Sequence, residues 1–159
     1  MMFRNVSESR FFSMDEVLQE LYKTVEEDSE KTYNLIVGSD SQKCGEKLVY
    51  VSVIVLHKVG ESGRFFYTKL IEPYKDTDLS EKIRMETWYT IEILKKIENS
   101  ILVSKIGKEN LSAHVDAGET GDSRKIVDSC TGWIRGEGFR CYQKPESWAA
   151  SHVADRFTK

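Results

Sequence analysis

The sequence has 159 residues, 40% hydrophobic and 31% charged, a balance typical of one folded domain and not of a disordered chain. The net charge of −3 gives no overall basic character of the kind typical of nucleic-acid-binding proteins. No apolar run approaches the roughly 18 residues of a membrane span, and the first residues lack the apolar core of a secretory signal. The three cysteines are widely spaced and form no CxxC pair, so we expect free thiols and a cytoplasmic location.

A helix is predicted to begin after Ser13, because Ser13 and Glu16 have the spacing of a capping box. Apolar residues then recur at helical spacing as far as Val25, and the acidic residues 26–30 end the helix. We interpret residues 1–32 as a helical extension packed on the core domain, which spans residues 33–159.

Three consecutive strands are predicted over residues 33–42, 48–58 and 64–72. The turns between them are short, which is typical of an antiparallel meander. The first strand ends unusually, because its apolar run is followed by Gly38 and then by the acid Asp40. A carboxylate at the end of a buried strand requires a cation or several hydrogen-bond donors nearby.

A long helix is predicted from the capping residues 76–81 to about Asn99. Its apolar stripe includes Leu79, Ile83, Thr90, Ile93, Leu94 and Ile97. Glu86 interrupts this stripe, and a charged residue on an apolar face is an informative anomaly. It is either an acid that reaches water at the edge of the stripe or a functional residue.

The second half of the sequence alternates strands and helices. A fourth strand ends at Asp116, and a helix capped by Asp122 or Ser123 ends near Gly136. A fifth strand is predicted over residues 139–144, and a last helix carries Asp155. Three strands followed by this alternation predict an α/β domain with a mixed sheet, behind one extra N-terminal helix.

Four acids stand out by their positions at strand ends or on helices that flank the sheet. They are Asp40, Glu86, Asp116 and Asp155. Each has an ordinary explanation by itself, as a turn former or a surface charge. Together they would form one anionic pocket, which suits hard divalent cations that prefer oxygen ligands.

Two of these acids lie in short motifs that resemble those of a known family. Gly38-Ser39-Asp40-Ser41-Gln42 resembles the opening motif of the ribonuclease H-like YkuK family, and His114-Val115-Asp116-Ala117-Gly118 is similar to its second motif. Further similar positions follow in the same order: Gly132, Gly136, Gly138-Phe139, Lys144-Pro145, Ala150-Ser151, Ala154-Asp155 and Thr158. The resemblance extends over nearly the whole sequence.

This resemblance implies a ribonuclease H-like fold, with a five-stranded mixed sheet whose second strand is antiparallel to the others. It also implies a divalent-metal-dependent nuclease that hydrolyses phosphodiester bonds of RNA, DNA or a hybrid. Asp40, Glu86, Asp116 and Asp155 would then bind Mg²⁺ or Mn²⁺. Two such ions about 3.5–4 Å apart activate a water and stabilise the leaving oxygen.

Other polar residues are candidates for supporting roles. Three basic residues are either phosphate contacts or ordinary surface charges: Arg124, Lys125 and Lys144. His152 lies three residues before Asp155, on the same face of the last predicted helix. It is either a proton shuttle for the reaction or a structural histidine. Ser41 and Gln42 are candidates to orient Asp40 by hydrogen bonds.

Two other functions stay open from the sequence alone. One is a catalytically silent ribonuclease H-like module that binds nucleic acid or a protein, and such a module would not bind Mg²⁺ or Mn²⁺ at millimolar concentration. The other is phosphotransfer, since residues 116–118 superficially fit the phosphate loops of sugar kinases and actin. That architecture needs two such domains, whereas this chain has the length of one.

Overall fold

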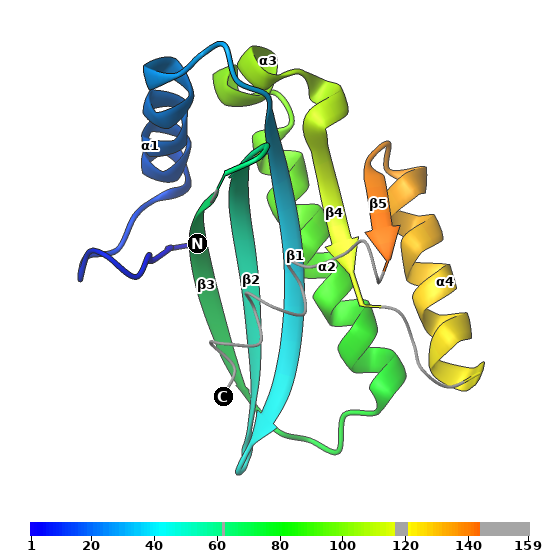
Figure 1. The fold of residues 1–159 in the computed structure, drawn as a ribbon. Coiled ribbons are helices and arrows are strands. Elements are labelled where there is room, and N and C mark those ends of the chain that lie inside the picture. Colours follow the sequence, from blue (N-terminus) through cyan, green and yellow to red (C-terminus); the bar gives the residue numbers. More distant parts are fainter. Residues whose placement is uncertain (62, 117–120, 144–159) are drawn as a thin grey trace.

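The computed structural model describes residues 1–61, 63–116 and 121–143, and five strands in these ranges form one mixed sheet (Figure 1). The strands are β1 (Tyr33–Cys44), β2 (Lys47–Lys58), β3 (Gly63–Pro73), β4 (Leu111–Val115) and β5 (Arg140–Gln143). Their order across the sheet is β3-β2-β1-β4-β5. β2 is antiparallel to β1 and β3, whereas β4 is parallel to β1 and β5. The predicted mixed sheet with its antiparallel meander is therefore confirmed.

The register of the β1–β2 hairpin is set by a two-residue turn. Cys44 pairs with Lys47, and Gly45 in the turn has a φ of 63°, in the left-handed region that favours glycine. Pairing then continues without interruption to Tyr33 and Lys58. Since each side chain of a strand faces one side only, this turn decides which residues of β1 face the helices.

The helices are α1 (Met14–Glu27), α2 (Leu79–Ile97), α3 (Ile101–Ile106) and α4 (Gly121–Gly136), with a 3-10 turn over Lys108–Asn110. The sequence did not predict α3, because its 6 residues are too few to show a helical apolar pattern. α4 begins at Gly121, so the predicted cap at Asp122 or Ser123 is wrong. β5 begins one residue after the predicted Phe139.

One hydrophobic core lies between the helices and a single face of the sheet. Helical members include Val17, Leu21, Val25, Ile93, Ile97, Leu102 and Ile134, and strand members include Leu35, Val37, Ile54 and Ala113. In Figure 1, α2 and α4 lie behind the sheet. Phe12 is fully buried in this core and meets the Phe66 ring edge-on, with 5.1 Å between centroids. Leu79, predicted on the inward stripe of α2, is instead 51% exposed in the first turn of the helix.

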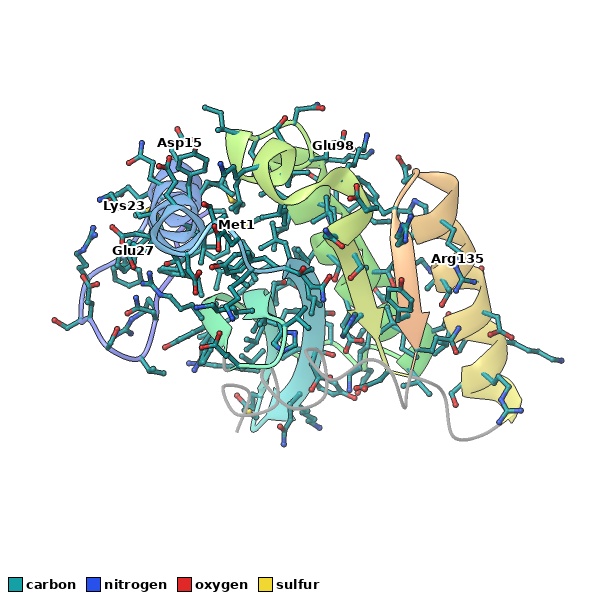
Figure 2. The ribbon with its side chains drawn as sticks, turned by 45° about the horizontal axis from the view of Figure 1, so that its top comes forward. Met1, Asp15, Lys23, Glu27, Glu98 and Arg135 are labelled. Carbon is teal, nitrogen blue, oxygen red and sulfur yellow. The ribbon has the colours of Figure 1, made fainter. Side chains whose placement is uncertain are left out.

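The N-terminus of α1 carries the capping box that the sequence predicts. The Glu16 amide donates to Ser13 Oγ at 3.2 Å, and the Ser13 amide donates to Glu16 Oε1 at 3.1 Å. Two backbone donors that the helix leaves without intrahelical partners are thereby satisfied. Figure 2 looks nearly along α1, and the exposed Asp15, Lys23 and Glu27 point away from the sheet.

Ser13→Ala is expected to lower the free energy of unfolding by about 1 kcal/mol, because the cap of α1 is lost. Urea denaturation followed by circular dichroism measures the change. Ser29→Ala is the matched control, since Ser29 is exposed beyond the end of α1. Equal changes in the two variants would contradict a specific role for the cap.

All three cysteines lie in the described part of the chain and are free, with Cys44 exposed and Cys130 and Cys141 buried. This agrees with the expectation of free thiols. Among the described helices, none is long and apolar enough to cross a membrane.

Candidate functional site

Two of the predicted acids lie at one edge of the sheet, just beyond the point where β1 and β4 stop pairing; Asp40 does not close β1, as the sequence predicted, but pairs with Val51 within it. The strands are paired in parallel up to Gly38 and His114, and β1 itself continues to Cys44. Asp40 and Asp116 each follow this last pair by two residues. The register therefore places both acids at the same level along the two strands.

Glu86 approaches from the opposite face, on α2. Ile36 packs in a second apolar cluster on the face of the sheet away from the helices. Alternation along β1 therefore directs Asp40 to that far face, and Ser39 and Ser41 toward α2. In agreement, Ser41 Oγ donates a hydrogen bond of 2.6 Å to Glu86 Oε1.

A cavity of about 280 Å³ at this edge is lined by Asp40, Glu86 and Asp116. Most of its other lining residues lie on α2, on α4 or on the side of β1 and β4 that faces these helices. Lys82 of α2 and Ser123 of α4 also line it. The fold therefore brings three of the four predicted acids to one cavity, from β1, α2 and the residue after β4.

The pKa of Glu86 reports the electrostatics of this cavity. Burial and, next, the charge of Asp40 raise the pKa of Glu86 to about 8, and Asp116 adds a smaller effect of the same sign. The Ser41 hydrogen bond and the Lys82 ammonium act in the opposite direction. At neutral pH, Glu86 of the metal-free protein therefore mostly keeps its proton, and a nearby cation would favour its ionised form.

The donor chemistry of the cavity fits a hard divalent cation, since carboxylate oxygens are the ligands that Mg²⁺ and Mn²⁺ prefer. The ligands are not grouped as closely as an ion would require. Within residues 1–61, 63–116 and 121–143, no three side chains among His, Cys, Asp and Glu come close enough to hold an ion as they stand. A metal centre here consequently stays a prediction.

The other predicted site residues are distributed differently. Ser41, predicted to orient Asp40, donates to Glu86 instead, because alternation turns it to the helix side of β1. Gln42 is partly exposed near the end of β1. Arg124 and Lys125 are exposed on α4 and are not among the described residues that line the cavity. The positions outside the described residues are Lys144, His152 and Asp155.

Sequence reasoning missed Lys82, Ser39 and Thr90, which also line the cavity. Lys82 precedes Glu86 by four residues, and that spacing was a readable signal because it places both side chains on one helix face. Thr90 Oγ1 donates to Ser39 Oγ at 2.8 Å across 51 residues of sequence. No local sequence pattern predicts such a contact.

Comparison with known proteins agrees with this fold and with the motifs. Residues 16–159 match the family described as ribonuclease H-like. The uncharacterized protein YkuK of Bacillus subtilis (strain 168) is 27% identical over 168 aligned residues, which cover 99% of this chain and 97% of YkuK. The chain therefore belongs to the ribonuclease H-like family.

Proposed function

We propose that this protein is a divalent-metal-dependent nuclease that hydrolyses phosphodiester bonds of RNA, DNA or an RNA–DNA hybrid. The observation that carries the proposal is the cavity lined by Asp40, Glu86 and Asp116, three oxygen donors from three separate elements. Membership of the ribonuclease H-like family supports a nuclease-like or nucleic-acid-related function.

In this proposal, Asp40, Glu86 and Asp116 hold Mg²⁺ or Mn²⁺, with Asp155 as the fourth ligand expected from the sequence. When bound, two such ions would supply an activated water and stabilise the leaving oxygen. Ser41 holds the Glu86 carboxyl group through its 2.6 Å hydrogen bond, so this ligand is oriented before an ion arrives.

Lys82 is the residue that we assign to the substrate phosphate. It is a partly buried cation in the lining of the cavity, whereas Arg124 and Lys125 are exposed on α4. Its charge offsets the carboxylates in the metal-free protein. Once cations neutralise those carboxylates, the ammonium group is available to a phosphate oxygen. Arg124, Lys125 and Lys144 would then serve the flanking backbone of a longer nucleic acid.

Lys82→Met is expected to slow cleavage about tenfold at subsaturating substrate, because one charged hydrogen bond to the phosphate is lost. Mn²⁺ affinity should stay equal or increase, since the repulsion between the ammonium group and the ion disappears. Steady-state cleavage and calorimetric Mn²⁺ titration measure the two effects. Lys96→Met, an exposed position on the same helix, is the control and should change neither. Loss of Mn²⁺ binding together with cleavage in Lys82→Met would contradict the phosphate role.

The proposed function itself is tested by titrating the protein with Mn²⁺ and Mg²⁺ in a calorimeter and by assaying labelled substrates. Single-stranded RNA, single-stranded DNA, duplex DNA and a hybrid are each incubated with Mn²⁺, with Mg²⁺ or with a chelator. We expect ion binding and cleavage of at least one substrate, abolished by the chelator. Cleavage that persists in the chelator would contradict a metal-dependent mechanism.

One observation favours a second candidate, a silent module that binds nucleic acid or a protein. No three potential ligands among the described residues are grouped as an ion would require. The same calorimetric titration separates the candidates, because the silent module predicts no heat of Mn²⁺ or Mg²⁺ binding at millimolar concentration.

A further inference from the structure

Three buried hydroxyl groups form a chain beneath α2. Ser52 Oγ of β2 and Ser39 Oγ of β1 are 2.7 Å apart, and Thr90 Oγ1 of α2 donates to Ser39 Oγ at 2.8 Å. All three residues are buried. This chain therefore connects two adjacent strands to the helix that carries Glu86.

Thr90 also holds the backbone of Glu86 directly. Its Oγ1 lies 3.0 Å from the Glu86 carbonyl oxygen and 2.8 Å from Ser39 Oγ, and its one proton is shared between these two acceptors. Ser41 holds the side chain of the same residue. Glu86 is thus tied to β1 twice, through the two serines that flank Asp40 in the sequence.

The stability of the core does not require these hydroxyls. Ser52 lies between Val51 and Val53, where the strand is otherwise apolar and buried. A buried hydroxyl loses its water contacts, and its hydrogen bonds do little more than offset that loss. Apolar side chains of similar shape would give a core of comparable stability, so the effect of the chain is chiefly on geometry.

We propose that Ser39, Ser52 and Thr90 are positioning residues that fix the place of Glu86 relative to Asp40 and thereby set the divalent-cation affinity of the cavity. This inference rests on the proposed function insofar as a bound cation is one of its two readouts. Outer residues that hold metal ligands in place change metal affinity by about 10–100-fold, and the same range is expected here.

The test measures Mn²⁺ affinity, by calorimetry and by electron paramagnetic resonance of the free ion. Thr90→Val keeps the side-chain shape but removes the hydroxyl, and we expect about tenfold weaker binding. Thr90→Ser restores the hydroxyl and should recover most of the affinity. Ser52→Ala acts on the far end of the chain and should weaken binding in the same direction.

Thr131→Val is the matched control. Thr131 is buried on α4, donates to the carbonyl oxygen of Val127 at 2.8 Å, and accepts from Gln143 Nε2 of β5 at 3.1 Å. Its replacement removes the same kind of helix-to-strand hydroxyl link, and the Thr131 side chain is not among the described side chains that line the acidic cavity. We expect an Mn²⁺ affinity within about twofold of the wild type.

A second readout needs no metal. In the metal-free protein, the amide ¹H and ¹⁵N shifts of Asp40 and Ser41 should move in Thr90→Val and stay in place in Thr131→Val. If Thr90→Val binds Mn²⁺ like the wild type, the positioning role is wrong and the proposed function stands. If the wild type binds no Mn²⁺, the proposed function falls, and unchanged Asp40 and Ser41 shifts in Thr90→Val would overturn the positioning role as well.

Discussion

Asp40→Asn is expected to reduce Mn²⁺ affinity and Mn²⁺-dependent cleavage by at least about a hundredfold, since even outer-shell changes at metal sites reach that size. Asparagine keeps the shape of the side chain and removes the charge that would attract the cation. Asp40 is held in place by the sheet, because it pairs with Val51 of β2 and follows the pairing of β1 with β4 by two residues. Calorimetry and a cleavage assay measure the two losses.

The loss should not come from unfolding. The charge of Asp40 is one cause of the raised pKa of Glu86, so its removal relieves repulsion in the metal-free protein. Thermal unfolding of Asp40→Asn is therefore expected at or above the wild-type temperature. Asp15→Asn, on the outward side of α1 (Figure 2), is the control for a carboxylate far from the cavity. Mn²⁺-dependent cleavage that survives in Asp40→Asn or in Asp116→Asn would exclude this site.

Glu86→Gln is expected to change stability and metal binding in opposite directions. The folded protein raises the pKa of Glu86 from 4.5 to about 8, so between these values the folded state binds more protons than the unfolded state. Wild-type stability should therefore fall as the pH rises through this window and level off above it. Glutamine carries no such charge, so the variant should be more stable by on the order of 4 kcal/mol at the alkaline end.

Denaturant titrations across this pH range measure the effect. Saturating Mn²⁺ should remove the slope in the wild type, because the ion favours ionised Glu86, and should do little for Glu86→Gln. Ser41→Ala should have the opposite effect to Glu86→Gln and steepen the pH dependence of stability. Loss of the hydrogen bond from Ser41 to the carboxylate raises the pKa of Glu86 further. Parallel pH profiles for wild type and Glu86→Gln would show that Glu86 does not govern the electrostatics of the cavity.

The sequence by itself determined the features that depend on neighbours in the chain. The capping box at Ser13 and Glu16 predicted the start of α1, since both hydrogen bonds form within one turn. Short turns predicted the meander of β1, β2 and β3 because they leave no room for a crossover. The ends of two apolar runs in the sequence marked Asp40 and Asp116 as acids that lie at one edge of the sheet. The helix α3 was not predicted from the sequence, because its 6 residues are too few to show helical periodicity.

Only the tertiary structure decided how the acids meet. Whether Ser41 serves Asp40 or Glu86 depends on which face of β1 is turned toward α2, and the pairing of β1 with β2 and β4 sets that face. The bond between Thr90 and Ser39 depends on the height at which α2 crosses the sheet, which is a matter of packing. Such contacts join residues far apart in the sequence, and no local propensity contains them. Local physics therefore determined where the acids stand on their elements, and packing determined the cavity that they share.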